Sequence, residues 1–453
     1  VRRGVTAAAA HRTPERAIGA ILFNLLVLGI FGAFLLLFRR ALYRDRRAMV
    51  LFTVLVVSVM AVGAVIARFE LPPELIPVTF ASLIVAVLWE GRLGLVLALV
   101  LALLIAGQTP FLGVTAPFTA ALGGAAAAFS VRMVQRRSRT WLFISIISLA
   151  YVAAVVAISL LRSRPFDEMT VSAAYGIANA VVASLVALGF LPLLETLTGV
   201  VTDQTLLELS DTNRPLLRRL QQEANGTFHH TINVANLAEA ACHAIGANGL
   251  LARVGAYYHD VGKLSKPQYF IENQPRGRNP HDKLKASMSC NIIRGHVAEG
   301  LKLAESERLP HAIRQFIPEH HGTQQIAYFF NRAKEQNPEG TVNEADYCYV
   351  GPKPQTKEAA VLMLADSVES ASHVLQDPTP ARIREMVERI VSQKMDEGQL
   401  DEAPLTLREI TTVEETLTSV LSGMYHHRID YPTGAVPATG TSAPSGATGG
   451  VGA

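Results

Sequence analysis

Histidine and aspartate residues scattered between positions 230 and 366 are the part of the sequence best suited to chemistry. The set is His230, His259, Asp260, His296, His320, His321 and Asp366. Neutral imidazoles combined with carboxylates suit first-row transition metals, and a single zinc site closes with three or four protein ligands. Five imidazoles and two carboxylates are too many for one ion. The pattern therefore predicts a site for two metals.

The chemistry that such a site suits is phosphoester hydrolysis. Two ions about 3.5–4 Å apart can polarise a phosphate, activate a water and stabilise the leaving oxygen. A carboxylate can bridge two ions, and Asp260 beside His259 is the candidate for that role. Lys263 follows three residues later, where its ammonium could bind a phosphate or protonate a leaving group; a surface ammonium is the alternative. Asp260 and Lys263 are our candidate catalytic residues.

The two adjacent pairs, His259-Asp260 and His320-His321, have a geometric consequence. Neighbouring residues on an ideal helix point about 100° apart, so the two members of a pair cannot face the same way. Gly262 and Gly322 follow the pairs closely, which places both pairs near a helix end. Either the second member of each pair reaches the second metal, or one member orients a ligand.

The elements before this site are strongly apolar. Half of the 453 residues are hydrophobic and 17% are charged, against roughly a quarter charged in ordinary soluble domains. Runs long enough for a hydrocarbon core of about 30 Å predict about seven membrane spans. They are Ala17–Phe38, Met49–Ala67, Leu71–Trp89, Leu93–Ala106, Val114–Val134, Trp141–Leu161 and Val171–Leu194.

Arginine clusters predict how these spans are oriented. One cluster, residues 39–47, follows the first run, and a second, residues 132–139, follows the fifth. The positive-inside rule places both in the cytoplasm. Seven crossings then put the N-terminus outside and everything after Leu194 inside. Four arginines before the first run conflict with this orientation, and the start at Val1 indicates a non-standard start codon or a fragment.

Composition excludes several other roles. A net charge of +3 without a basic stripe argues against a nucleic-acid polymer as partner. The spans contain almost no ionisable residue mid-span, so we interpret them as an anchor or signal-receiving bundle rather than a transporter; they could also pair two copies into a homodimer. Cys242, Cys290 and Cys348 lack CxxC spacing, which fits a reducing cytosol.

The second half of the sequence predicts an all-helical soluble domain behind short amphipathic exit helices. Its expected helices are Thr231–Ile245, Leu250–Tyr258, Ala286–Leu303, Ala312–Pro318, Ala359–Leu375 and Ile383–Met395. The polar stretch Gln324–Pro354 could act as a lid. The predicted division is an extracytoplasmic remnant (1–16), a transmembrane domain (17–195), a linker (196–225), a catalytic domain (226–432) and a disordered tail (433–453).

The order His230, His259-Asp260, Asp366 is the pattern of the HD superfamily. Over residues 17–432 the chain resembles the seven-transmembrane HD-domain cyclic di-AMP phosphodiesterases, the PgpH type. The stretches that carry the resemblance are Val234–Glu239, Gly255–Lys263, Tyr269–Gln274, Asn279–Asp282, Gly351–Gln355 and Leu364–Ser367.

The resemblance implies two divalent ions, manganese or iron, held by the seven residues of the first paragraph. It also implies hydrolysis of cyclic di-AMP to the linear dinucleotide pApA by a multi-pass protein of the bacterial inner (plasma) membrane with its catalytic domain in the cytoplasm. Family members carry an extracytoplasmic domain and one more span upstream, which this sequence does not include.

Two alternatives stay open from the residues alone. One is another cyclic dinucleotide, such as cyclic di-GMP, although Gly-Thr-Gln-Gln follows His320-His321 in place of a GYP signature. The other is a membrane receptor whose HD fold only binds a nucleotide. The complete ligand set argues against the receptor, because a pure sensor has no need of metals.

Overall fold

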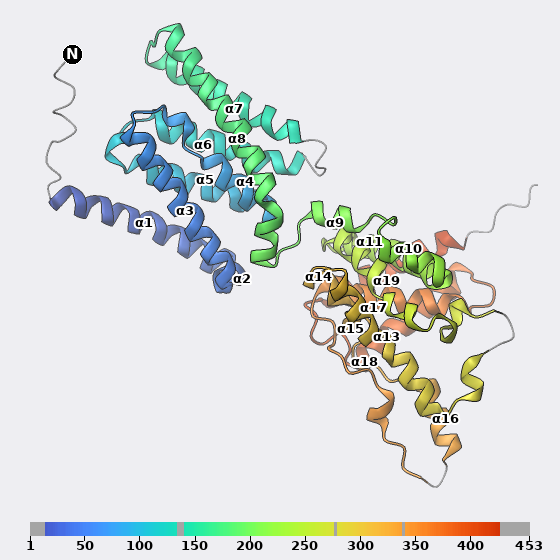
Figure 1. The fold of residues 1–453 in the computed structure, drawn as a ribbon. Coiled ribbons are helices and arrows are strands. Elements are labelled where there is room, and N and C mark those ends of the chain that lie inside the picture. The colour runs from blue at the N-terminus through green and yellow to red at the C-terminus, as the bar shows by residue number, and fades with distance from the viewer. Residues whose placement is uncertain (1–13, 134–139, 276–278, 338–339, 426–453) are drawn as a thin grey trace, which may run out of the picture.

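Two groups of helices follow each other along the chain and form two separate bundles that meet near α9 (Figure 1). The structure, a computed structural model, describes residues 14–133, 140–275, 279–337 and 340–425. Within these ranges the regular elements are helices, and the only β-type pairing is an isolated bridge between Gln325 and Cys348. The predicted all-α class is confirmed. Residues 1–13 of the predicted remnant (1–16) and the whole predicted tail (433–453) lie outside the described residues.

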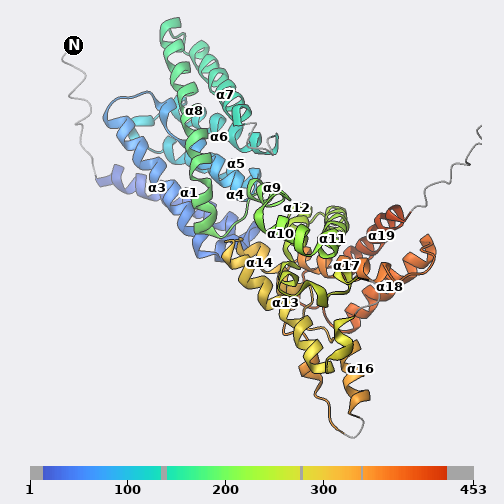
Figure 2. The same ribbon diagram turned by 45° about the vertical axis from the view of Figure 1, so that its right-hand side comes forward.

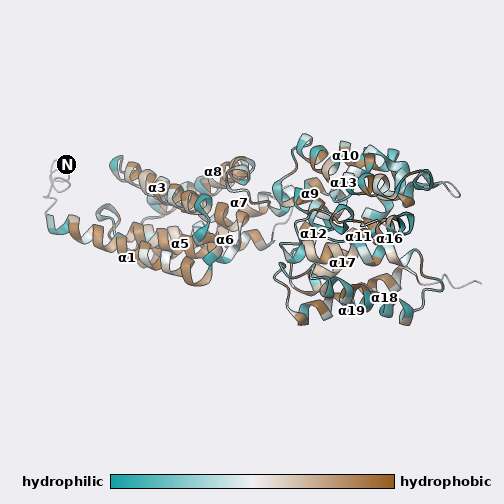
Figure 3. Cartoon of the chain, turned by 90° about the horizontal axis from the view of Figure 1, so that it is seen from below, coloured by the Kyte–Doolittle hydropathy of each residue, from teal (hydrophilic) through white to brown (hydrophobic). Residues whose placement is uncertain are grey.

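The first group contains the membrane helices, which are apolar over most of their length (Figure 3). Its elements are α1 (Pro14–Phe38), α2 (Arg40–Arg44), α3 (Arg46–Arg68), η1 (Pro73–Leu75), α4 (Val78–Leu88), α5 (Gly91–Ala106), η2 (Thr109–Phe111), α6 (Thr115–Met133), α7 (Thr140–Leu161) and α8 (Phe166–Thr198). By length and composition, four of these helices could cross a membrane: α1, α3, α7 and α8.

Three shorter apolar helices, α4, α5 and α6, make up the rest of this group. The sequence prediction of one span over Leu71–Trp89 is wrong in detail, because the short 3-10 helix η1 and Pro77 precede α4, which has only 11 residues. Its side chains are buried on every side, as Leu83 and Val85 show with 0% exposure. A helix that is apolar all round belongs inside a bundle. The count of seven spans stays a prediction.

A buried asparagine ties the membrane helices together. Asn179 of α8 donates hydrogen bonds to the carbonyls of Glu74 (2.6 Å) and Ile76 (3.0 Å), and accepts one from the Thr79 hydroxyl (3.1 Å). Its amide is 3.1 Å from the hydroxyl of Tyr151. A buried amide without partners is costly in an apolar medium, so this network explains Asn179 as a structural residue.

The exit from the membrane is built around α9 (Asp203–Leu209). The carboxylate of Glu195, near the end of α8, accepts hydrogen bonds from the Thr202 backbone (3.0 Å) and the Thr205 hydroxyl (2.8 Å). At the other end of α9 the Leu209 carbonyl accepts a hydrogen bond from Tyr258 (2.9 Å). The short helix is therefore bonded to a membrane helix on one side and to the soluble domain on the other.

The soluble group holds the residues predicted to do chemistry (Figure 2). Its main helices are α10 (Pro215–Glu223), α11 (Asn225–Ala244), α12 (Gly249–Tyr258), α13 (Ala286–Ser306), α14 (His311–Arg314), α15 (Phe316–Glu319), α16 (Ala327–Gln336), α17 (Lys357–Ser372), α18 (Pro380–Asp396) and α19 (Leu407–Met424). Short 3-10 turns are η4 (Val261–Ser265), η5 (Pro267–Tyr269), η6 (Ile271–Asn273), η7 (Pro280–Lys283) and η8 (Glu344–Tyr347).

One hydrophobic core runs through this group, from Leu206 to Leu421, with α17 at its centre. The expected helix Ala312–Pro318 is divided between α14 and α15. Two helices were missed: α19, and α16 within the stretch predicted as a polar lid. The side chains of α16 explain its presence, because Phe329 and Phe330 pack against Tyr347 in a small separate core.

Candidate metal centre

Five elements bring the seven predicted residues to one place. His230 lies on α11, His296 on α13 and Asp366 on α17. The pair His259-Asp260 directly follows α12, and His320-His321 directly follows α15. Both pairs therefore sit at a helix end, as the glycines after them predicted. All of these side chains are buried except that of His321, which is partly exposed.

The donor atoms form two groups, and within each group they lie no more than 4.8 Å from one another. The first group is Asp260, His296, His320 and His321, and the second is His230, His259 and Asp366. Three or four donors of this kind suit one transition-metal ion. The described residues therefore contain two groups of donor atoms that could each hold a metal ion.

Asp260 lies between the two groups. Its Oδ2 is 3.4 Å from Nε2 of His259 and 3.7 Å from Nε2 of His230. Its Oδ1 is 3.4 Å from Nε2 of His296 and 3.7 Å from Nε2 of His320. The two oxygens of one carboxylate thus face different sets of imidazoles, which is the placement that a bridging ligand requires.

The imidazoles are oriented for metal binding by bonds on their far side. Nδ1 of His259 is 2.6 Å from the Ala256 carbonyl, and Nδ1 of His296 is 2.6 Å from the Ile293 carbonyl. Nδ1 of His320 bonds a carbonyl of its own helix in the same way. Metal-binding histidines usually donate their second N–H to such an acceptor, which fixes the tautomer and the ring.

The opposite nitrogens show that a cation fits here. Nε2 of His259, His296 and His320 and Oδ1 of Asp260 are buried and have no hydrogen-bond partner among the residues that the structure describes. Leaving a buried polar atom unsatisfied costs about 1–3 kcal/mol, and native proteins contain few such atoms. Divalent ions bound between these nitrogens and Asp260 would satisfy all four atoms.

Glu369 is a member of the site that the sequence analysis missed. Its Oε2 lies 2.6 Å from Nδ1 of His230, whose Nε2 lies 2.9 Å from Oδ1 of Asp366. Glu369 also accepts a hydrogen bond from the amide of Asn233 (2.9 Å). The spacing could have revealed it, because Glu369 follows Asp366 by three residues and shares its helix face.

His321 has a different environment from its neighbour. Its ring stacks on Tyr349, with centroids 4.0 Å apart and an interplanar angle of 16°. Tyr349 comes from the segment between η8 and α17, and no pattern in the sequence pointed to it. Among the residues that the structure describes, the His321 ring is positioned by this stacking and not by a side-chain hydrogen bond.

Lys263 is held between two carboxylates. Its Nζ is 2.6 Å from Oδ2 of Asp260 and 2.9 Å from Oε1 of Glu272, and it lies over the ring of Phe270. Burial alone would lower the pKa of Lys263, but these two carboxylates outweigh it and raise the pKa. The ammonium is thus kept charged beside Asp260, which favours electrostatic positioning over proton donation.

Comparison with known proteins identifies two parts of the chain. A family model described as a 7TM receptor with intracellular HD hydrolase matches residues 15–202, and the HD domain model matches residues 227–371. The chain belongs to this 7TM-HD family. Its HD domain contains all seven of the predicted ligands, and the family is one of membrane proteins with a divalent-metal site in the HD domain.

The similar curated proteins share most of this chain. The protein named cyclic-di-AMP phosphodiesterase PgpH of Bacillus subtilis is 36% identical over 427 residues, which are 90% of this chain and 59% of that protein. PgpH of Listeria monocytogenes is 39% identical over 79% of this chain and 50% of its own length. The chain thus spans only about half to three-fifths of these relatives.

A solved structure is similar to the HD domain. It is the crystal structure of the L. monocytogenes PgpH HD domain in complex with cyclic-di-AMP. The sequences are 45% identical, and the match covers 48% of this chain and 100% of that one, with a TM-score of 0.46.

Protonation should compete with metal binding in this HD domain. Burial opposes the charged form of His230, but Asp366 and Glu369 outweigh it and raise its pKa to about 10. In the same way Asp260 and Asp366 overcome burial and raise the pKa of His259 to about 9. Burial and the neighbouring His259 instead lower the pKa of His320 to about 3.

We expect metal affinity to rise with pH because His230 and His259 must lose their protons when a metal binds. At a pH below the pKa of one of these rings, its proton must be displaced by the metal, and metal affinity falls by about tenfold for each pH unit of decrease. The rise should be steep at neutral pH and flatten above about pH 10, where both rings are already neutral. Chelator competition across this range measures it, and an affinity independent of pH would contradict the assignment.

Substitution of Glu369 by glutamine should weaken metal binding by about 10–100-fold, the usual effect of losing a carboxylate behind a histidine ligand. The physical reason is the loss of the charge that orients Nδ1 of His230. Chelator competition on the purified protein measures the change. Glu385→Gln, an exposed position on α18, is the matched control, and equal affinities for the two variants would refute the role of Glu369.

Proposed function

We propose that the protein is a membrane-anchored, metal-dependent phosphodiesterase that hydrolyses cyclic di-AMP to pApA in the cytosol. The observation that carries the proposal is Asp260, whose two oxygens face two sets of buried imidazoles. The names of the PgpH relatives supply the substrate. Since the chain spans only part of those relatives, their activity is a hypothesis for it.

The residues that would hold the ions are the two groups His230, His259 and Asp366, and His296, His320 and His321, with Asp260 shared. Manganese or iron suits imidazole and carboxylate ligands. Two such ions would polarise the phosphate, supply a nucleophile at neutral pH and stabilise the leaving oxygen. The net reaction adds one water across one phosphodiester P–O bond and leaves a linear dinucleotide with a terminal phosphate.

The protein's own side chains preorganise this reaction. The backbone carbonyls behind His259 and His296 fix the direction of the two rings. Lys263 holds Oδ2 of Asp260 in place and adds positive charge near the position of the substrate phosphate. Because these groups are buried, they need little reorganisation when charge develops on the phosphate.

The position of the arginine cluster supports a cytoplasmic HD domain. Arg39, at the end of α1, and Thr202, at the entry to α9, line the same cavity. The soluble domain therefore lies on the side of the membrane that carries residues 39–47, which the positive-inside rule assigns to the cytoplasm. We also propose that the protein lies in the inner membrane, crosses it seven times and forms a homodimer. The domain boundaries predicted above are part of the same proposal.

Turnover of cyclic di-AMP and cyclic di-GMP by the purified full chain, measured side by side with Mn²⁺, tests the function. We expect pApA from cyclic di-AMP and a much slower reaction with cyclic di-GMP, together with two metal ions per chain by elemental analysis. Faster turnover of cyclic di-GMP would overturn the substrate. Binding of cyclic di-AMP without any turnover would favour the receptor alternative.

A further inference from the structure

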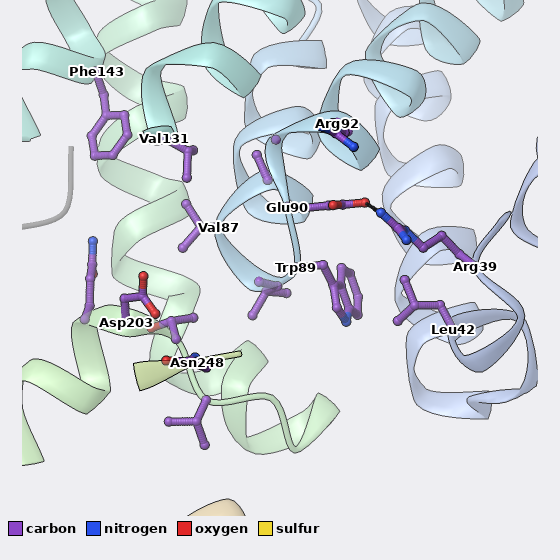
Figure 4. Close-up of a pocket in the computed structure, with 16 residues that line it drawn as sticks. Arg39, Leu42, Val87, Trp89, Glu90, Arg92, Val131, Phe143, Asp203 and Asn248 are labelled. Carbon is purple, nitrogen blue, oxygen red and sulfur yellow. Dashed lines mark hydrogen bonds and ion pairs between the residues drawn. The ribbon is translucent and has the colours of Figure 1, made fainter. Parts of the chain in front are cut away.

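A cavity of about 640 Å³ lies where the membrane helices meet the soluble domain (Figure 4). Its walls come from the ends of the membrane helices, the start of α9 and the loop before α12. The polar residues that matter here are Arg39, Glu90, Arg92, Asp203 and Asn248. None of them belongs to the metal centre. The volume is in the range of small-molecule sites, about 300–1,000 Å³.

The cavity combines an apolar wall with a charged rim. Leu42 and Val87 supply partly exposed apolar surface, and Trp89 lies beside Leu42 (Figure 4). Tryptophan is enriched where a membrane helix reaches the headgroup level. A ligand that matches both surfaces has a polar head and an apolar body.

The cavity is lined by two arginines and two carboxylates, so its attraction for a negatively charged head depends on arginines that are not neutralised by a carboxylate. Arg39 is paired with Glu90, whereas Arg92 is exposed and has no ion pair among the residues that the structure describes. Besides Arg39, the cluster at residues 39–47 adds four arginines near the cavity, with one aspartate. Basic pockets between membrane helices on the cytoplasmic side attract anionic lipid headgroups.

We propose that this cavity binds the headgroup of an anionic phospholipid. Arg92 contacts the phosphate, and Trp89 and the apolar wall contact the glycerol and the first part of the acyl chains. Asp203, on the opposite wall, weakens the attraction for the phosphate because its carboxylate is also negatively charged. The binding site does not depend on the function proposed for the HD domain.

A lipid in this cavity would touch Asn248, which is bonded to the beginnings of two helices that lead to the metal centre. The Asn248 side chain caps α12 by accepting a hydrogen bond from Leu251 (2.9 Å), and α12 ends at His259-Asp260. The Asn248 backbone donates to Glu358 (2.8 Å) in the first turn of α17, the helix that carries Asp366. Lipid binding should therefore slow hydrogen exchange over residues 203–209 and 249–258.

Native mass spectrometry of the full chain in detergent tests the proposal, with anionic phosphatidylglycerol as the probe and zwitterionic phosphatidylcholine, which has no net charge, as the comparison. We expect phosphatidylglycerol to bind more tightly. Arg92→Gln should weaken its binding by about tenfold, the effect of one lost hydrogen bond to a charged group. Arg384→Gln removes an exposed arginine on α18 of the soluble domain that does not line the cavity and should leave binding unchanged.

Asp203→Asn provides a test in the opposite direction, because removing this carboxylate should tighten phosphatidylglycerol binding. That result would support the site even if Arg92→Gln failed to fold. Equal binding by Arg92→Gln and the wild type, or equal binding of the two lipids, would overturn the proposal. Displacement of the lipid by excess inorganic phosphate would show that the site recognises a free phosphate instead. Unchanged hydrogen exchange would refute the link to the metal centre.

Discussion

Replacement of Asp260 by asparagine is expected to reduce hydrolysis of cyclic di-AMP by at least about 10³-fold. The amide is nearly the same size but lacks the charge, so it cannot serve both groups of imidazoles. Metal ions contribute several kcal/mol of transition-state stabilisation, and each 1.36 kcal/mol is a factor of ten in rate. The substitution also removes the nearer partner of Lys263.

Two measurements on the purified full chain separate the causes: the turnover rate and the metal content. We expect both to fall in Asp260→Asn and in Asp260→Ala. Asp396→Asn, an exposed position at the end of α18, makes the same chemical change away from the site and should match the wild type. Activity retained in Asp260→Ala would refute the bridging role.

Gly262→Ala adds a single methyl group and should strongly destabilise the HD domain. A Cβ at this position would lie 1.8 Å from the His296 carbonyl oxygen and 2.4 Å from the Gly300 nitrogen. Both contacts are with backbone, so α13 would have to move away from the turn that follows Asp260. We expect a loss of more than about 4 kcal/mol in the free energy of unfolding, or about 8–16 °C in melting temperature.

Thermal unfolding can be followed by the reaction of the Cys242 thiol with a labelling reagent, because this thiol is buried in the folded chain. Gly295→Ala is the matched control, since it lies on α13 beside His296 and its Cβ would meet nothing within 4 Å. That variant should gain about 0.5–1 kcal/mol, the usual benefit of alanine inside a helix. Equal melting temperatures for the two variants would show that the close approach at Gly262 is not needed.

The same contact explains why His296 could be assigned to the site only by resemblance or by structure. It lies 36 residues from Asp260 in the sequence, and nothing in its surroundings distinguishes it from the histidines outside the site. The approach of α13 to Gly262 places it opposite Oδ1 of Asp260. Local pattern predicts the helix, but not the side of the domain that it faces.

Some errors in the predicted fold had visible causes. Pro77 interrupts the run predicted as the third span and could have indicated the break before α4. The spacing of Ile410, Val413, Leu417 and Leu421 is that of an amphipathic helix and could have revealed α19. The buried face of α16 could not be recognised, because its partner Tyr347 lies in a separate segment.

The sequence by itself determined the all-helical class, the division into an apolar and a soluble half, and the types of donor atoms available to a metal. These properties depend on side-chain chemistry and on spacing within one helix, which are local. Only the tertiary structure decided which oxygen of Asp260 faces which imidazoles, that Lys263 is held between two carboxylates, and that Glu369 and Tyr349 support the ligands. Those relations join residues far apart in the chain, and their distances are set by how whole helices pack.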